Sequence, residues 1–179
     1  YHVAHISTKE AVAAIRLAKS RGLPVSCDTA PHYFSLTEMD VADYRTFFKV
    51  KPPLRDEEDR IAVVEAVASG LIDIICSMHT PQDEESKRLP FEEAASGAVG
   101  LETLLPAALR LVHAEMMDLP TLWRALSLNP AKRLGLPGGR IAIDFDAEGS
   151  RDLFHQGDCD GFVADLVERL GWQSEFERI

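Results

Sequence analysis

The chain has 179 residues, with 19 basic and 29 acidic side chains and a formal net charge of −10. This acidic balance argues against a nucleic-acid or anionic-membrane surface, because phosphates would repel the chain. No apolar run reaches the roughly 18 residues that a membrane span needs. Cys27, Cys76 and Cys159 are scattered without a CxxC spacing, which indicates a reduced, cytoplasmic chain. Since Tyr1 lies inside a predicted strand, we expect further sequence to precede it.

Buried strands and amphipathic helices are predicted to alternate along the first half of the chain. Thr8 is a predicted N-cap, and Gly22 and Gly70 each end a helical pattern. Near-continuous apolar strands between amphipathic helices indicate a parallel sheet covered on both faces. In chain order, the predicted elements are a strand at 1–7, a helix between Thr8 and Gly22, a strand at 23–29, a long irregular connection at 30–54, a helix at 56–69 and a strand at 71–76.

The second half of the chain is predicted to be mostly helical, with a polar, turn-rich texture after residue 147. Its predicted elements are an apolar helix within 90–112, short helices at 119–128 and 130–136, a strand at 140–145 and a helix at 162–170.

Three βα units suit either a small open sheet or part of a (β/α)₈ barrel. A complete barrel needs about 250 residues, so this chain would hold only part of one. In both architectures, functional groups gather at the C-terminal ends of the strands. His5 lies at the end of the first predicted strand, Asp28 and His32 come at the end of the second, and His79 follows the third. Each histidine alone suits a hydrogen-bonded, partly buried imidazole, but three at successive strand ends favour a metal or proton-transfer site.

Other polar and sulfur-bearing residues admit simpler interpretations. The basic turn at 49–55, KVKPPLR, suits either an anionic substrate or a solvated loop. The acidic runs DEEDR and QDEESKR are typical of solvated helix starts, where carboxylates are favourable. Cys27 and Cys76 lie inside apolar strands and are expected to be small core residues.

Six sequence blocks follow one another over residues 1–147. They are YHVAHISTKEAVAAIRLAKSRGLPV, TAPHYFSLTE, FKVKPPLRDEEDR, GLIDIICSMHTP, SKRLPFEEAASGAVGLETLLP and LSLNPAKRLGLP. In this order they resemble the C-terminal half of a class I dihydroorotase, of the amidohydrolase superfamily. The resemblance implies an α/β fold, a partial (β/α)₈ TIM-type barrel. Residues 1–136 would hold its last three strands and following helices, and residues 137–179 a remnant of a flanking β-domain with a divergent tail.

The resemblance also implies a chemistry. Class I dihydroorotases interconvert N-carbamoyl-aspartate and dihydroorotate in pyrimidine biosynthesis. Their zinc lowers the pKa of bound water, and a carboxylate at the end of the last strand moves the proton. His5 falls on the histidine of the second zinc. Met78 stands where the family's DHAPH motif has its aspartate, which is both zinc ligand and proton shuttle, while His79 is retained. A thioether is a poor ligand for such a site and carries no proton.

The substrate positions are altered too. Lys51 replaces the asparagine of the family's KVNPPLR motif, and Gln82 replaces the histidine of its DHAPH motif. Ser96 and Gly97 match a backbone pair that contacts substrate. The other metal ligands of the family would lie before Tyr1.

Three functions therefore stay open. The chain is part of a zinc amidohydrolase of the dihydroorotase type, or a non-catalytic relative that binds aspartate carbamoyltransferase, or an unrelated α/β domain with structural histidines. Met78 favours a chain without activity, and the retained blocks argue against the unrelated domain. A partial barrel also exposes open sheet edges, which invite association, so we expect an oligomer.

Overall fold

A computed structural model describes residues 1–136 of the chain. The predicted strand at 140–145, the predicted helix at 162–170 and the expected β-domain remnant at 137–179 lie outside these residues. The chain divides into two compact units, residues 1–126 and 127–179. Every feature of the sheet and of the candidate site lies in the first unit.

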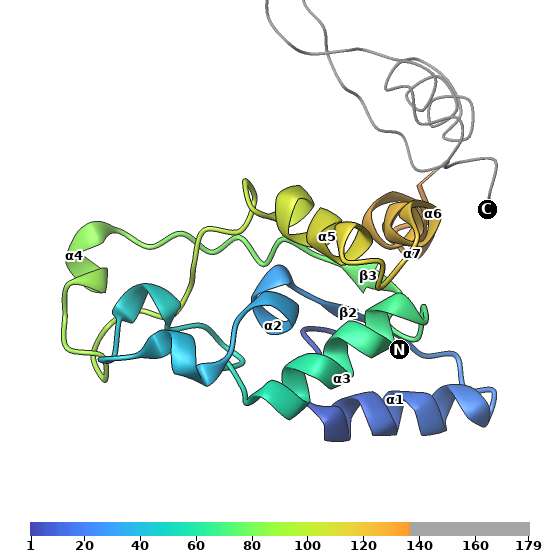
Figure 1. Cartoon of the computed structure of the whole chain (residues 1–179), viewed down its shortest axis with the longest axis horizontal. Coiled ribbons are helices and arrows are strands. Elements are labelled where there is room, and N and C mark those ends of the chain that lie inside the picture. Colours follow the sequence, from blue (N-terminus) through green and yellow to red (C-terminus); the bar gives the residue numbers. More distant parts are fainter. Residues whose placement is uncertain (137–179) are drawn as a thin grey trace, which may run out of the picture. The chain divides into compact units, whose positions relative to one another are not determined.

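Three short parallel strands form the sheet of the first unit (Figure 1). These are β1 (His2–Val3), β2 (Ser26–Thr29) and β3 (Ile74–Ile75), in the order β1-β2-β3. The predicted parallel sheet is confirmed, but its strands are shorter than expected. β1 ends early because His5 adopts a left-handed backbone with φ 59°. The pairing nevertheless continues past it, since the Ile6 amide donates to the Asp28 carbonyl at 2.8 Å.

Helix α1 (Lys9–Ser20) connects β1 to β2, as predicted. The Thr8 side chain caps it by accepting a hydrogen bond from the Ala11 amide at 3.1 Å. Gly22 follows the helix with φ 72°, a conformation that costs glycine little. Val12 and Ile15 form the buried face of α1.

Helix α3 (Glu57–Ala68) lies beside α1 and also packs on α2 (Figure 1). The Asp56 side chain caps it by accepting from the Asp59 amide at 2.9 Å. The sequence places Ile61 and Val64 on one apolar stripe of this amphipathic helix, but Ile61 is 43% exposed. Because two helices cover α3, its buried face is broader than one stripe and consists of Asp59, Val63, Val64, Ala66 and Val67.

The connection at 30–54 contains short helices that the sequence did not predict. They are α2 (Pro31–Ser35) and the 3₁₀ turns η1 (Glu38–Val41) and η2 (Thr46–Phe48). Proline is favoured in the first helical turn, where Pro31 stands in α2. Four residues of α2 are buried, so this segment is part of the core.

The apolar helix expected within 90–112 is present as α5 (Leu104–His113), but it begins later than predicted. A separate short helix, α4 (Glu84–Lys87), precedes this part of the chain. The intervening segment instead pairs with the stretch after β3, where Ala98 forms a parallel bridge with His79. This pairing requires glycine, because a Cβ on Gly97 would lie 2.3 Å from the Thr80 carbonyl oxygen.

The last described helices follow one another without a gap. They are α6 (Leu119–Trp123), the π-helical turn η3 (Arg124–Leu128) and α7 (Asn129–Arg133). The sequence predicted two separate helices at 119–128 and 130–136. Among residues 1–136, no helix is long and apolar enough to cross a membrane.

We predict that Phe34→Ala lowers the free energy of unfolding by about 3–5 kcal/mol, because Phe34 is only 2% exposed. The matched control is Phe47→Ala, since Phe47 is 64% exposed and its truncation should cost at most about 0.5 kcal/mol. Urea denaturation followed by circular dichroism measures both. Equal losses for the two variants would contradict the packing around α2.

We also predict that Gly97→Ala destabilises the chain by about 1–3 kcal/mol more than Gly70→Ala. Both glycines have a positive φ, so the backbone strain affects both variants. Only Gly97 has a carbonyl in the path of a new Cβ, whereas no described atom lies within 4 Å at Gly70. The same denaturation experiment compares them, and an equal cost would show that the segment does not lie against Thr80.

Candidate functional site

The ends of the three strands converge on the Asp28 carboxylate. Asp28 lies in β2, His5 lies two residues after β1, and Cys76 directly follows β3. Asp28 Oδ1 accepts a hydrogen bond from the His5 amide at 2.7 Å and lies 3.1 Å from His5 Nδ1. The Cys76 thiol approaches the same oxygen, with Sγ at 3.5 Å. The prediction that polar groups gather at the strand ends therefore holds for His5 and Asp28.

The second oxygen of Asp28 is held by a residue that the sequence interpretation missed. His2 Nε2 lies 2.8 Å from Asp28 Oδ2, and His2 Nδ1 lies 2.8 Å from Ser26 Oγ. The register explains the contact, because His2 pairs with Ser26 and Asp28 lies two residues further on, on the same face. Strand alternation could have found His2 once the register was known.

Cys76 was predicted to be a core residue, and it is half-buried within the cluster. The position of Cys76 also follows from the register. Ile74 pairs with Asp28, and Cys76 lies two residues beyond Ile74, so it lies on the same face of the sheet as Asp28. Burial raises the pKa of the Cys76 thiol to about 12, and the neighbouring Asp28 charge adds to this rise. The thiol is therefore protonated at neutral pH. Cys27, in contrast, is fully buried in β2, as predicted.

Met78 points into the packed part of this unit. Its sulfur lies 3.4 Å from the Tyr33 hydroxyl, which donates at 2.8 Å to the Pro52 carbonyl. Met78 packs against the hydrophobic core and has a left-handed backbone with φ 47°. Burial also raises the pKa of Tyr33 above its usual range, so this hydroxyl stays neutral. Neither residue presents an ionised group at neutral pH.

His79 is exposed and is oriented by the backbone of the segment after residue 97. Its Nδ1 accepts hydrogen bonds from the amides of Gly100 and Leu101, at 3.1 and 3.2 Å. A ring nitrogen that accepts two hydrogen bonds carries no proton and has no lone pair to spare for a cation. Only Nε2 of His79 remains available to a ligand.

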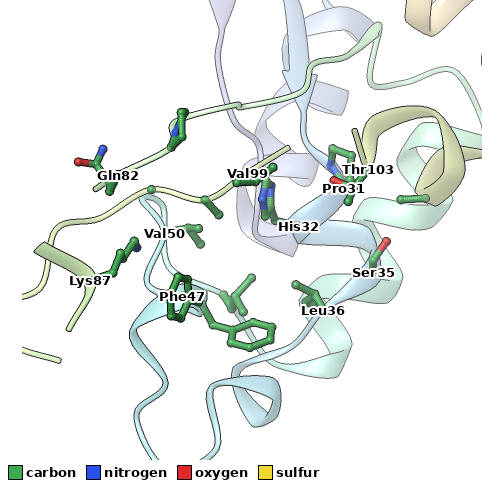
Figure 2. A pocket seen from close by; sticks show the side chains of 16 residues that line it. Pro31, His32, Ser35, Leu36, Phe47, Val50, Gln82, Lys87, Val99 and Thr103 are labelled. Atoms are coloured by element: carbon green, nitrogen blue, oxygen red, sulfur yellow. The ribbon is translucent and has the colours of Figure 1, made fainter. Parts of the chain in front are cut away.

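A cavity of about 400 Å³ lies between α2, η2 and the segment after residue 97 (Figure 2). Gln82 and Gly97 line it, but Lys51 and Ser96 do not, and Lys51 is exposed. The structure thus brings together only two of the four predicted substrate positions. The remaining lining is mainly apolar, and its polar members include His32, Lys87, Ser35 and Thr103.

Two buried ionisable groups lie in the wall of this cavity. His32 is 8% exposed and lies beside Val99 in Figure 2. Burial lowers the pKa of His32, and its Nδ1 has no hydrogen-bond partner among the described residues. Lys87 donates from Nζ to the Thr46 carbonyl at 3.0 Å, and burial likewise lowers its pKa. His32 was among the candidate histidines, but Lys87 was not predicted, because it belongs to the run QDEESKR that was expected to be solvated and it is instead buried.

Three residues of the strand-end cluster offer donor atoms of the kinds that hold a metal ion. They are His5, Asp28 and Cys76, and their ligand atoms all lie within 4.8 Å of one another. Imidazole, carboxylate and thiolate are the ligand types of zinc sites in proteins. The residues present therefore fit one such cation, and His5 is among them.

The sequence is similar to curated dihydroorotases. The dihydroorotase of Wolbachia sp. subsp. Brugia malayi is 45% identical over 148 residues, which cover 83% of this chain and 33% of the relative. The dihydroorotase of Geobacter metallireducens is 49% identical over 140 residues, or 78% and 33%. No protein-family model matches the chain. The chain spans about one third of the length of these relatives.

The fold is similar to solved structures of hydantoinases and dihydropyrimidinases. The L-hydantoinase (dihydropyrimidinase) of Arthrobacter aurescens superposes with a TM-score of 0.71 at 34% identity, covering 75% of this chain and 31% of that one. The dihydropyrimidinase of Brevibacillus agri NCHU1002 gives 0.73 at 25% identity, covering 82% and 34%. By sequence, the chain is homologous to about one third of the length of the curated dihydroorotases, and its fold is similar to part of the hydantoinases.

Proposed function

We propose that this chain is part of a dihydroorotase-type cyclic amide hydrolase whose acid–base group has been lost, so that it does not itself support hydrolysis of dihydroorotate. The observation that carries this proposal is the position of Met78, whose thioether packs on the core and meets the Tyr33 hydroxyl. Loss of a general acid–base group typically costs about 10²- to 10⁴-fold in rate. The neutral Tyr33 and the protonated Cys76 thiol offer no replacement carboxylate.

The proposal places this chain in a (β/α)₈ barrel. Residues 1–136 would supply its last three strands and following helices, with residues 137–179 as the remnant of a flanking β-domain. The parallel order β1-β2-β3 and the similarity to hydantoinases support this assignment. Dihydroorotate or N-carbamoyl-aspartate would lie at the C-terminal ends of the strands, near Gln82 and Gly97 in the cavity wall.

A zinc ion would be held through His5. When bound, such an ion polarises an amide carbonyl and lowers the pKa of water. The chain's own contribution is then to orient His5, because Asp28 accepts from its amide and lies 3.1 Å from its Nδ1. Lys51 and Ser96 are less well placed for a role toward the same substrate, since neither lines the cavity.

The second candidate function is a non-catalytic partner of aspartate carbamoyltransferase. The same observation favours it, because a site without its acid–base carboxylate can be retained for its fold alone. Under this alternative the chain would contribute a docking surface. The oligomeric state and the cytoplasmic location expected from the sequence stay predictions.

A chimaeric dihydroorotase that contains this chain, called the graft below, tests whether the chain supports hydrolysis. We would replace the aligned segment of the Geobacter metallireducens dihydroorotase by this chain and measure hydrolysis of dihydroorotate with zinc present. We expect a rate at least about 10²-fold below that of the intact relative, and we expect Met78→Asp to raise it by about 10²- to 10⁴-fold, because the variant returns a carboxylate.

Met39→Asp is the matched control, since Met39 is 78% exposed and its substitution should leave the rate unchanged. Circular dichroism verifies that each graft is folded. Activity of the unaltered graft at the level of the intact relative would overturn the proposal, as would equal rates for the two aspartate variants. An inactive graft that captures aspartate carbamoyltransferase would support the second candidate.

A further inference from the structure

We infer that His5, Asp28 and Cys76 form a site for one zinc-class cation with a thiolate among its ligands. The resemblance supplies only His5, and the comparisons assign no role to Asp28 or Cys76. The inference rests on the part of the proposed function that places a zinc ion at His5, and it names two further ligands for that ion. It does not depend on whether the chain hydrolyses any substrate.

The spacing of the three donor atoms fits a tetrahedral ion. The distances are 3.1 Å from His5 Nδ1 to Asp28 Oδ1, 3.5 Å from Cys76 Sγ to Asp28 Oδ1, and 3.7 Å from Cys76 Sγ to His5 Nδ1. Zinc bonds are about 2.0–2.1 Å to nitrogen and oxygen and about 2.3 Å to sulfur, which places tetrahedral donors about 3.3–3.6 Å apart. A cation can therefore occupy this triangle with only small side-chain adjustments.

The backbone holds these three residues in place independently of any ion. Asp28 and Cys76 project from the same face of two hydrogen-bonded strands, because Ile74 pairs with Asp28. His5 is held by its amide hydrogen bond to Asp28 Oδ1 in a left-handed conformation that is unfavourable for a residue with a Cβ. Binding of a cation would therefore cost little conformational entropy in these three residues.

A further hydrogen bond orients the carboxylate. His2 Nε2 lies 2.8 Å from Asp28 Oδ2, which leaves Oδ1 directed at His5 and Cys76. Such outer partners of a ligand are a regular feature of metal sites, and their loss typically costs about 10- to 100-fold in metal affinity. The His5 side chain is 36% exposed, so the ion can enter from solvent.

The donor types select the cation. One nitrogen, one oxygen and one sulfur suit Zn²⁺, Co²⁺ or Cd²⁺, whereas Mg²⁺ and Ca²⁺ prefer oxygen ligands alone. On binding, the Cys76 thiol releases its proton to solvent, and the thiolate and the Asp28 carboxylate then balance the two charges of the ion. Three protein ligands leave the fourth tetrahedral position for water, as in zinc sites that carry out chemistry.

Cobalt titration of the reduced, metal-free 179-residue chain tests the site directly. We expect one Co²⁺ per chain, with a thiolate-to-cobalt charge-transfer absorption that Zn²⁺ abolishes by displacement. Cys76→Ala should remove this absorption and weaken zinc binding by more than about 100-fold, whereas His2→Ala should weaken it by about 10- to 100-fold. Cys27→Ala and Cys159→Ala are the matched controls and should keep the absorption.

A second measurement needs no variant and so does not depend on the folding of one. The unaltered chain is treated with a maleimide in the presence and absence of Zn²⁺, and the modified cysteines are identified by peptide mass spectrometry. We expect zinc to protect Cys76 at a stoichiometry of one ion per chain. Unchanged modification of Cys76, or a charge-transfer absorption that survives in Cys76→Ala, would overturn the inference.

Discussion

The arrangement of the strand ends depends on the contacts that the Asp28 carboxylate makes with His2, His5 and Cys76. The Asp28 side chain is 10% exposed, and a buried carboxylate is costly unless both of its oxygens have partners. One oxygen is held by the His5 amide and the other lies against His2, so Asp28 contacts both β1 itself and the residue two positions after it. Cys76, which directly follows β3, approaches the same oxygen as His5, with Sγ 3.5 Å from Oδ1. One carboxylate of β2 thus joins the ends of both neighbouring strands.

The parts of the fold that depend on local chemistry could be predicted from the sequence. The Thr8 cap and the glycines that end α1 and α3 are examples, because each acts on its own helix. The helix expected within 90–112 begins only at Leu104 for a non-local reason, since the segment around Ala98 pairs with His79 instead. The prediction that Cys76 is a core residue missed its contact with Asp28 for a similar reason. That contact follows from the strand register and not from the neighbouring sequence.

The structure separates two properties that the family chemistry combines in one site. In the proposed function, the lost acid–base group belongs to position 78, where the Met78 thioether packs against the core and the Tyr33 hydroxyl. Cation binding depends on a different set of atoms, which β1, β2 and β3 carry on neighbouring strand ends. The first can therefore be lost while the second is retained. On these two proposals, the chain would keep the fold and a cation site without the proton transfer that hydrolysis requires.

X-ray absorption at the zinc edge of the zinc-loaded chain tests the central claim most directly, because it reports the atoms that surround the ion. The cluster of His5, Asp28 and Cys76 predicts one sulfur neighbour at about 2.3 Å and the remaining neighbours, nitrogen and oxygen, at about 2.0–2.2 Å. A first shell without sulfur, or one with two or more sulfur atoms, would contradict the assignment.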